Sequence, residues 1–284
     1  MAIHPESCES TLSNLELFQT PTTHIATDFS KYTEFSSTTA IESSNSIEFQ
    51  IEGDDSEYLD FSQSFLYLRC KILAKDRKEL KKVTSGTDAT VPPRSVVFLA
   101  NLGIAAIFKQ VEVYLANQLI SNNDTLYSYR AMFETLLSYS KDVKAEFLKS
   151  GGYYPETHDL DEHEDVAKAD TSGVNQSAVA RFNKGKFGKS FELLGRIHTD
   201  FMAQPRYLPG KIPVKLKLHR QQPQFFLMSA TDTDYILEIE NATFYAKFDQ
   251  ITSSIRAAHL SKWQNDTIKY PLRRVKMSYF TSDD

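Results

Sequence analysis

Cysteine is scarce in this sequence, with only Cys8 and Cys70 among 284 residues. The two lie in different contexts, so they do not form the disulfide framework that holds many small secreted domains together. No window approaches the ~18 to 20 consecutive apolar residues of a membrane-spanning helix. Residues 1–11 lack the basic and apolar regions of a secretory signal. We therefore expect a protein that is made inside a cell, is not secreted and has no membrane span.

Sequence motifs for catalysis and nucleotide binding are also missing. There is no G-x-S-x-G, P-loop, G-x-G-x-x-G or CxxC pair. The densest group of metal-ligand residue types, at residues 158–165, has neither HExxH nor HxxEH spacing and lies in a polar stretch that cannot hold ligands in a fixed geometry. His198, His219 and His259 are isolated, and we interpret each as a structural histidine. The sequence therefore predicts no catalytic residue, no metal site and no cofactor.

Positive charge is in deficit, since the formal net charge is -5 and the pI is about 5.8. A folded face that neutralises many phosphates needs a concentrated surplus of lysine and arginine. The lysine run within residues 75–93 lacks interleaved aromatic residues, so we interpret it as a solvated loop. We expect no specific nucleic-acid site.

Aromatic residues, by contrast, are abundant, with 19 Phe and 14 Tyr, and they are favoured on pleated, half-buried surfaces. From Ile212 to His219 apolar and polar residues alternate, so one face of an extended strand is apolar. This pattern is typical of an antiparallel sheet that is covered on one side. Lys215, Lys217 and His219 on the other face would protect an edge strand or contact a neighbouring copy, and this strand alone favours edge protection.

Other segments also have the pattern of strands. They are residues 47–51, 58–72, 104–120, 191–197, 224–228, 235–248 and 268–280. A tight hairpin connection is predicted at Ala116-Asn117, because asparagine tolerates a positive φ. Within the 235–248 segment the inward-facing set changes parity after Ile239, which predicts a β-bulge near Glu240-Asn241.

Helices are expected in a few places. Within an insertion at residues 124–150, a long helix is predicted by a stripe of residues at helical spacing, namely Leu126, Tyr129, Phe133, Leu136 or Leu137, and Ser140. A second amphipathic piece, Val143 to Leu148, ends at Gly151-Gly152. Residues 253–264 suit a short helix, and residues 12–18 suit one or two helical turns. Residues 155–188 are polar and are expected to form a long loop. Without a βαβ rhythm, the fold class is all-β: an antiparallel jelly-roll β-sandwich with a short helical insertion.

A series of short segments, in this order along the chain, carries a resemblance to a known family. The segments are Cys8–Ser10, Leu15–Phe18, Glu57–Asp60, Leu66–Arg69, Phe108–Val113, Tyr127–Ala131, Glu134–Tyr139, Gly195–His198, Arg206–Leu208, Lys215–Leu218 and Tyr270–Val275. Together they resemble the double jelly-roll major capsid (hexon) proteins of adintoviruses and of the related Polinton (Maverick) elements.

The resemblance implies a structural protein of the virion. Such proteins have two jelly rolls side by side, and three copies form a pseudo-hexagonal capsomer of an icosahedral shell, with other capsid proteins such as penton as partners. Residues 1–45 are rich in Ser, Thr and Glu and are expected to be an N-terminal arm. By the resemblance residues 46–250 are the first jelly roll. Residues 251–284 are a linker helix and the first strand of an incomplete second roll. The expected assembly is a homotrimer of the full-length protein.

Two other classes of function remain open. A single jelly-roll binding module would recognise carbohydrate or protein through its loops and would place aromatic residues there, whereas most of the Phe and Tyr residues lie in predicted strands and helices. Tyr153-Tyr154 is the main exception. A cupin-type enzyme would need several histidines and a carboxylate on adjacent strands, a pattern that the scattered histidines do not supply. The capsid subunit ranks first, the binding module second and the enzyme last.

Overall fold

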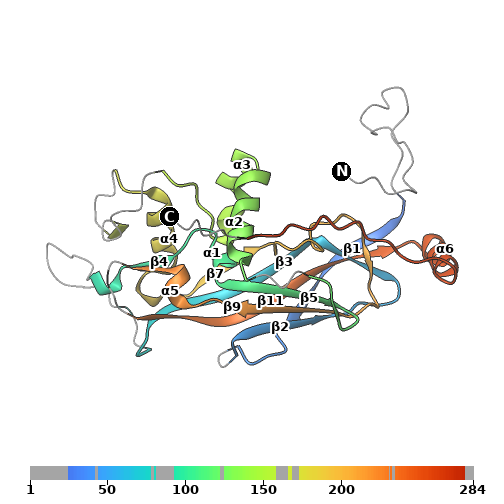
Figure 1. Cartoon of the computed structure of the whole chain (residues 1–284), viewed down its shortest axis with the longest axis horizontal. Coiled ribbons are helices and arrows are strands. Elements are labelled where there is room, and N and C mark those ends of the chain that lie inside the picture. The colour runs from blue at the N-terminus through green and yellow to red at the C-terminus, as the bar shows by residue number, and fades with distance from the viewer. Residues whose placement is uncertain are drawn as a thin grey trace, which may run out of the picture.

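The computed structural model describes most of the chain as an antiparallel β-sandwich (Figure 1). The described residues are 25–41, 44–77, 80, 93–121, 125–157, 166–167, 173–229, 231 and 234–278. Cys8, the predicted helical turns at 12–18 and the histidine and acid cluster at 158–165 lie outside them. In the described part, no helix is long and apolar enough to span a membrane.

The first sheet contains the longest strands and has the order β1-β11-β3-β7, with β8 also paired to β3. Its members are β1 (Thr27–Ser36), β3 (Glu57–Ala74), β7 (Phe191–Gly195), β8 (Leu208–Pro209) and β11 (Tyr235–Ile251). All its pairings are antiparallel. The inward-facing residues predicted for β3 are buried, namely Leu66, Leu68, Cys70 and Ile72.

The second sheet has the order β2-β9-β5-β6. Its strands are β2 (Ser46–Ile51), β5 (Phe108–Leu115), β6 (Gln118–Leu119) and β9 (Val214–Arg220). In β9 the alternation is confirmed, because Leu216 and Leu218 are fully buried while Lys215 and Lys217 face outward. The edge-protection interpretation is wrong, since β9 has β2 on one side and β5 on the other. The ammonium groups of both lysines instead bind the carboxylate of Glu48, at 2.7 and 3.2 Å.

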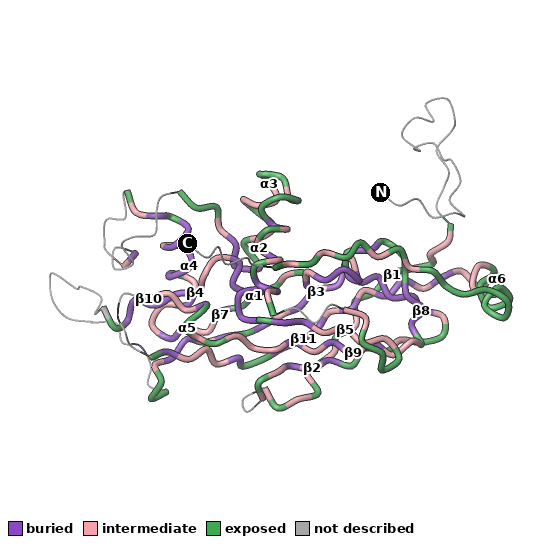
Figure 2. The backbone as a smooth tube through the Cα atoms, in the orientation of Figure 1, coloured by how far each residue is buried: buried purple, intermediate pink, exposed green. Residues whose placement is uncertain are grey.

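The hydrophobic core lies between the two sheets, where Figure 2 shows the buried backbone. Phe49 of β2 and Phe244 of β11 meet there from opposite sheets, with ring centroids 6.1 Å apart. Both rings are fully buried. Each such side chain stabilises the fold by about 1.5–3 kcal/mol relative to an exposed one.

Two local predictions on strand geometry are confirmed. The register of β11 against β3 shifts between Ile239 and Asn241, which is the predicted β-bulge. Because of this extra residue, both Ile239 and Ala242 are buried. At the turn between β5 and β6, Ala116 and Asn117 have φ angles of 45° and 66°, as a two-residue hairpin requires.

Helices connect and flank the sheets. The predicted insertion forms α2 (Tyr127–Ser138), α3 (Lys141–Ala145) and η3 (Phe147–Gly151), and it ends at Gly152, whose φ is 82°. The predicted helix near the C-terminal end is α6 (Ser253–Trp263). Short helices replace the first residues of two predicted strands, because α1 (Gly103–Ala106) precedes β5 and α5 (Pro223–Phe226) precedes β10 (Leu227–Ser229). Strand β10 pairs with β4 (Val97–Leu99), which follows η2 (Pro93–Ser95).

Two expectations from the sequence missed regular elements. The arm predicted for residues 1–45 contains β1, which pairs with β11 although most of its side chains are exposed. The loop predicted for residues 155–188 contains α4 (Gln176–Gly185) and η5 (Lys186–Gly188). In α4 the side chain of Asn175 caps the first turn by accepting from the Ser177 amide at 3.1 Å, and Phe182 is buried.

In a third segment, the sequence predicts a strand that the described residues do not form. Residues 268–280 were predicted to be a strand, but in the described portion, up to residue 278, this segment forms no ladder. It follows α6 and runs back along the sandwich in an extended form (Figure 1). Tyr270 and Leu272 pack against the core, and the Tyr270 hydroxyl donates to the carbonyl oxygen of Tyr207 at 3.1 Å.

Candidate interaction surface beside helix α2

Helix α2 turns an apolar face to solvent. Its buried face consists of Tyr127 and of small or polar residues, namely Ser128, Ala131 and Thr135. The stripe that predicted this helix lies on the other side, where Phe133 is 51% and Leu137 is 83% exposed. The helix is therefore confirmed, but its apolar stripe does not face the core. Contiguous exposed apolar side chains of this kind mark interaction surfaces.

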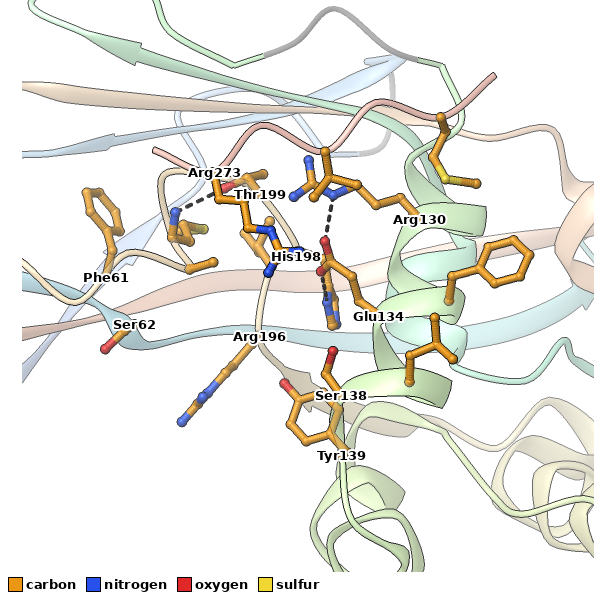
Figure 3. A pocket seen from close by; sticks show the side chains of 17 residues that line it. Phe61, Ser62, Arg130, Glu134, Ser138, Tyr139, Arg196, His198, Thr199 and Arg273 are labelled. Atoms are coloured by element: carbon orange, nitrogen blue, oxygen red, sulfur yellow. Dashed lines mark hydrogen bonds and ion pairs between the residues drawn. The ribbon is translucent and has the colours of Figure 1, made fainter. Parts of the chain in front are cut away.

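A groove of about 870 Å³ adjoins this apolar face (Figure 3). One wall is α2, another is the loop at residues 196–203 that follows β7, and a third is the extended segment at residues 273–277. Apolar side chains line much of it, including Phe61, Ile197, Met202, Phe133, Leu137 and Val275. We call this feature the α2 groove. Its walls come from parts of the chain that are far apart in sequence.

A network of charged side chains holds these walls together. Arg130 binds two carboxylates: Glu134, with Nε to Oε1 at 2.8 Å, and Asp200, with Nη2 to Oδ1 at 2.6 Å. The second oxygen of Glu134 lies 2.9 Å from Nδ1 of His198. The backbone amide of Val275 donates to Asp200 Oδ1 at 3.2 Å. The network therefore ties α2 to the loop after β7 and to the C-terminal segment.

The electrostatics of this network favour fixed charges. Burial alone would lower the pKa of Arg130, but the carboxylates of Glu134 and Asp200 raise it above its ordinary value. Burial alone would raise the pKa of Glu134, but bonds from His198 and Arg130 hold it below its usual range. Burial also raises the pKa of Tyr127, whose hydroxyl oxygen accepts from the His198 amide at 3.3 Å. These shifts move the groups away from neutral pH, as in a structural ion-pair network.

Two further arginines lie at the rim of the α2 groove. The guanidinium of Arg196 lies over the ring of Phe65, 5.8 Å from its centroid. Arg273 belongs to the C-terminal segment, and both arginines are exposed. In the part of the chain that the structure describes, neither forms an ion pair with a carboxylate. The rim therefore carries positive charge that the network does not neutralise.

The histidines singled out in the sequence do not come together. His198 binds Glu134 in the network, His219 Nε2 lies 3.2 Å from Glu112 Oε1, and His259 Nδ1 lies 2.9 Å from the Tyr58 hydroxyl. The three histidines thus lie in separate parts of the fold, and their structural role stays a prediction. In the described ranges there is no group of three or more His, Cys, Asp or Glu residues that could hold a metal ion. The burial of Cys70 raises the pKa of its thiol to about 12.

Sequence reasoning missed the charged network, although part of it left a signal. Arg130 and Glu134 are four positions apart, the spacing of a helical ion pair. The segments Tyr127–Ala131, Glu134–Tyr139, Gly195–His198 and Tyr270–Val275, which carry part of the family resemblance, all meet around the α2 groove. Asp200 was not singled out, because only the folded loop brings it to Arg130.

The chain was also compared with known proteins by sequence. No protein-family model matches it. An uncharacterised protein of Caenorhabditis elegans is 23% identical over 274 residues, which cover 93% of this chain and 59% of the worm protein. The chain thus spans less than two thirds of this relative.

Similar solved structures include viral capsid proteins. A chain from the Sputnik virophage matches with a TM-score of 0.52 at 13% identity, over 89% of this chain and 54% of that chain. The Faustovirus major capsid protein matches with a TM-score of 0.49 at 10% identity, over 88% of this chain and 59% of that one. The likeness to the virophage chain shows the fold. The all-β jelly-roll sandwich predicted from the sequence is confirmed.

Proposed function

We propose that this chain is a structural subunit of a virus capsid and corresponds to the N-terminal roll of a double jelly-roll major capsid protein. The observation that carries the proposal is the match to the Sputnik virophage chain, which extends over 89% of this chain but only 54% of that one. One roll of a two-roll protein would give this relation. The worm relative is likewise matched over nearly all of this chain but over only 59% of its own length.

The finer assignment, to the adintovirus and Polinton type, rests on the sequence resemblance. In that type three two-roll copies form a pseudo-hexagonal capsomer, in which rotational symmetry closes the trimer. The partners of this subunit are then further copies of itself and other capsid proteins such as penton, and its place is the virion.

The local chemistry of the described residues supports a mechanical role. The charged network of Arg130, Glu134 and Asp200 joins separate segments, which suits a rigid wall. The pKa of Arg130 is raised and that of Glu134 is lowered, so these two groups keep their charges near neutral pH. Permanent assemblies bury about 2,000 Å² or more per contact, so a capsid subunit needs extensive apolar outer surface. The exposed face of α2, with Phe133 and Leu137, supplies part of such a surface.

Self-association of the purified chain tests the proposal. Light scattering coupled to size-exclusion chromatography, together with negative-stain electron microscopy, should show trimers or larger assemblies. A monodisperse monomer at every concentration would contradict the capsid role. If that monomer also bound a glycan array, the single-roll binding module would become the better interpretation.

A further inference from the structure

We propose that residues 253–278, which comprise α6 and the extended segment after it, form a detachable strap. The strap opens as one unit about a hinge at Thr252, while the sandwich stays folded. Figure 1 shows α6 at one end of the sandwich and the extended segment running back along it. The docked strap supplies the third wall of the α2 groove, so opening removes this wall. This device belongs to the single chain and does not depend on the proposed function.

The strap buries little of its own surface. Every residue from 253 to 278 is exposed or half-buried. In the extended part, the half-buried side chains that face the core or the α2 groove are Tyr270, Leu272, Val275 and Met277. A segment opens more easily than the rest of a fold when it removes little apolar surface from water. The strap should therefore open at a lower free energy than the long buried strands β3 and β11.

One loop receives the extended part of the strap. The ring of Tyr270 contacts that of Phe201, with centroids 5.8 Å apart, and its hydroxyl donates to the carbonyl oxygen of Tyr207 at 3.1 Å. Further along, the Val275 amide donates to Asp200 Oδ1 at 3.2 Å. All three partners belong to the connection between β7 and β8. These contacts are made by side chains and single backbone groups, so they can break without the loss of a strand ladder.

Helix α6 rests on β3 and follows a fixed point of the chain. His259 Nδ1 lies 2.9 Å from the Tyr58 hydroxyl, and the ring centroid of Trp263 lies 6.5 Å from that of Tyr58. Just before α6, the Thr252 amide donates to the carbonyl oxygen of Ala26 at 3.0 Å. The ladders of β11 end at residues 250 and 251. A hinge at Thr252 therefore leaves every pair of β11 intact.

The sole tryptophan of the chain reports the opening. Trp263 lies in α6 and is 37% exposed, so opening moves its indole further into water and shifts its emission to longer wavelength. A urea titration of the full chain is followed by tryptophan emission and by far-ultraviolet circular dichroism. We expect the emission to change at a lower urea concentration than the signal of the sheets. Coincident transitions would overturn the proposal, because strap and sandwich would then unfold together.

A substitution distant from the tryptophan tests whether the strap opens as one unit. Tyr270→Ala removes a ring contact and a hydrogen bond, so it should raise the equilibrium constant for opening about tenfold. The emission midpoint of Trp263 should then move to lower urea, while the circular dichroism midpoint stays. The control Tyr129→Ala removes a half-exposed tyrosine whose ring lies 5.6 Å from that of Phe225, outside the strap, and should change neither midpoint. If Tyr270→Ala leaves the emission midpoint unchanged, α6 opens alone and the proposal is wrong.

Thiol labelling tests whether the strap walls the α2 groove. Met202 lines the groove together with the strap and is 5% exposed, so a cysteine in its place should react slowly with N-ethylmaleimide while the strap is docked. In a full chain with Cys8→Ser and Met202→Cys, adding Tyr270→Ala should accelerate labelling about tenfold, because the rate follows the open population. The chain with Cys8→Ser alone gives the rate of the buried Cys70. A labelling rate that Tyr270→Ala does not change would show that the strap does not cover this wall.

Discussion

Nη1 of Arg181 in α4 donates to the carbonyl oxygen of Leu99 in β4 at 3.0 Å, although 82 positions separate them. The same guanidinium lies over the ring of Phe98, 5.4 Å from its centroid, and its Nη2 binds Glu156 Oε1 at 3.1 Å. Its side chain is only 2% exposed. One buried cation thus joins a helix to the small two-stranded sheet and to the chain after Tyr153.

Removing the carboxylate from this contact should cost more than removing an exposed one. Glu156→Ala leaves the buried Arg181 guanidinium without its counter-charge, and arginine cannot lose its proton to compensate. We expect the free energy of unfolding to fall by about 2 kcal/mol, measured by urea denaturation at neutral pH. The control is Glu146→Ala, an 82% exposed side chain 3.7 Å from Lys149, which should change stability by less than about 0.5 kcal/mol. Equal effects would contradict the structural role of Arg181.

Features of the fold that follow from the alternation of apolar and polar residues along one strand could be predicted from the sequence. The pattern in β9 places Leu216 and Leu218 in the core because the period of a strand is two residues. The bulge in β11 was visible for the same reason, since the change of parity after Ile239 has to be absorbed by one extra residue. Such signals need only the neighbouring residues of one strand.

Features that depend on distant partners could not be predicted. Strand β1 is held by its ladder to β11, and its exposed side chains leave no alternation to detect. Helix α4 has a narrow buried face around Arg181 and Phe182, so its polar composition resembles that of a loop. The network at the α2 groove likewise needs the loop after β7 to bring Asp200 to Arg130.

Stability should depend on pH through Glu134. Its pKa is lower in the folded protein than in the unfolded chain, so its ionised form stabilises the fold above the unfolded value of about 4.3, and this contribution is lost as pH falls through the folded pKa. Glu134→Gln should therefore melt below the wild type at neutral pH, and the gap should narrow below about pH 4. Melting curves across this range measure the effect. For Glu52→Gln, which changes an exposed glutamate, we expect no such narrowing.

The hairpin between β5 and β6 offers a stabilising substitution. Ala116 has a φ of 45°, in the left-handed region that side chains with a Cβ avoid. Ala116→Gly should relieve this strain and raise the free energy of unfolding by about 0.5–1 kcal/mol. Chemical denaturation measures the change. The matched substitution Ala257→Gly, in the exposed interior of α6, should lower stability or leave it unchanged, because glycine disfavours a helix. A loss of stability at position 116 would show that the turn is not strained there.

Deletion of single residues tests the β-bulge in β11. Ile239 pairs with Cys70 and Asn241 pairs with Arg69, so Glu240 is the extra residue. Deleting Glu240 keeps both pairs and restores regular alternation. The side chain that is lost has an exposed ion pair with Arg69 at 3.0 Å, which contributes little. We therefore expect this variant to remain folded and soluble.

Deleting Glu238 instead places side chains on the wrong face of the sheet in either register that β11 can adopt. If the bulge is kept, Leu237 and the residues before it move to the opposite face of the sheet, and Tyr235 loses its buried position. If the bulge is absorbed, Ile239 turns outward and Glu240 takes its place in the core, where an unpaired carboxylate is strongly unfavourable. We expect this variant to melt far below the Glu240 deletion or to aggregate, as measured by circular dichroism of the soluble fraction. Equal tolerance of the two deletions would mean that the parity of β11 does not determine which side chains reach the core.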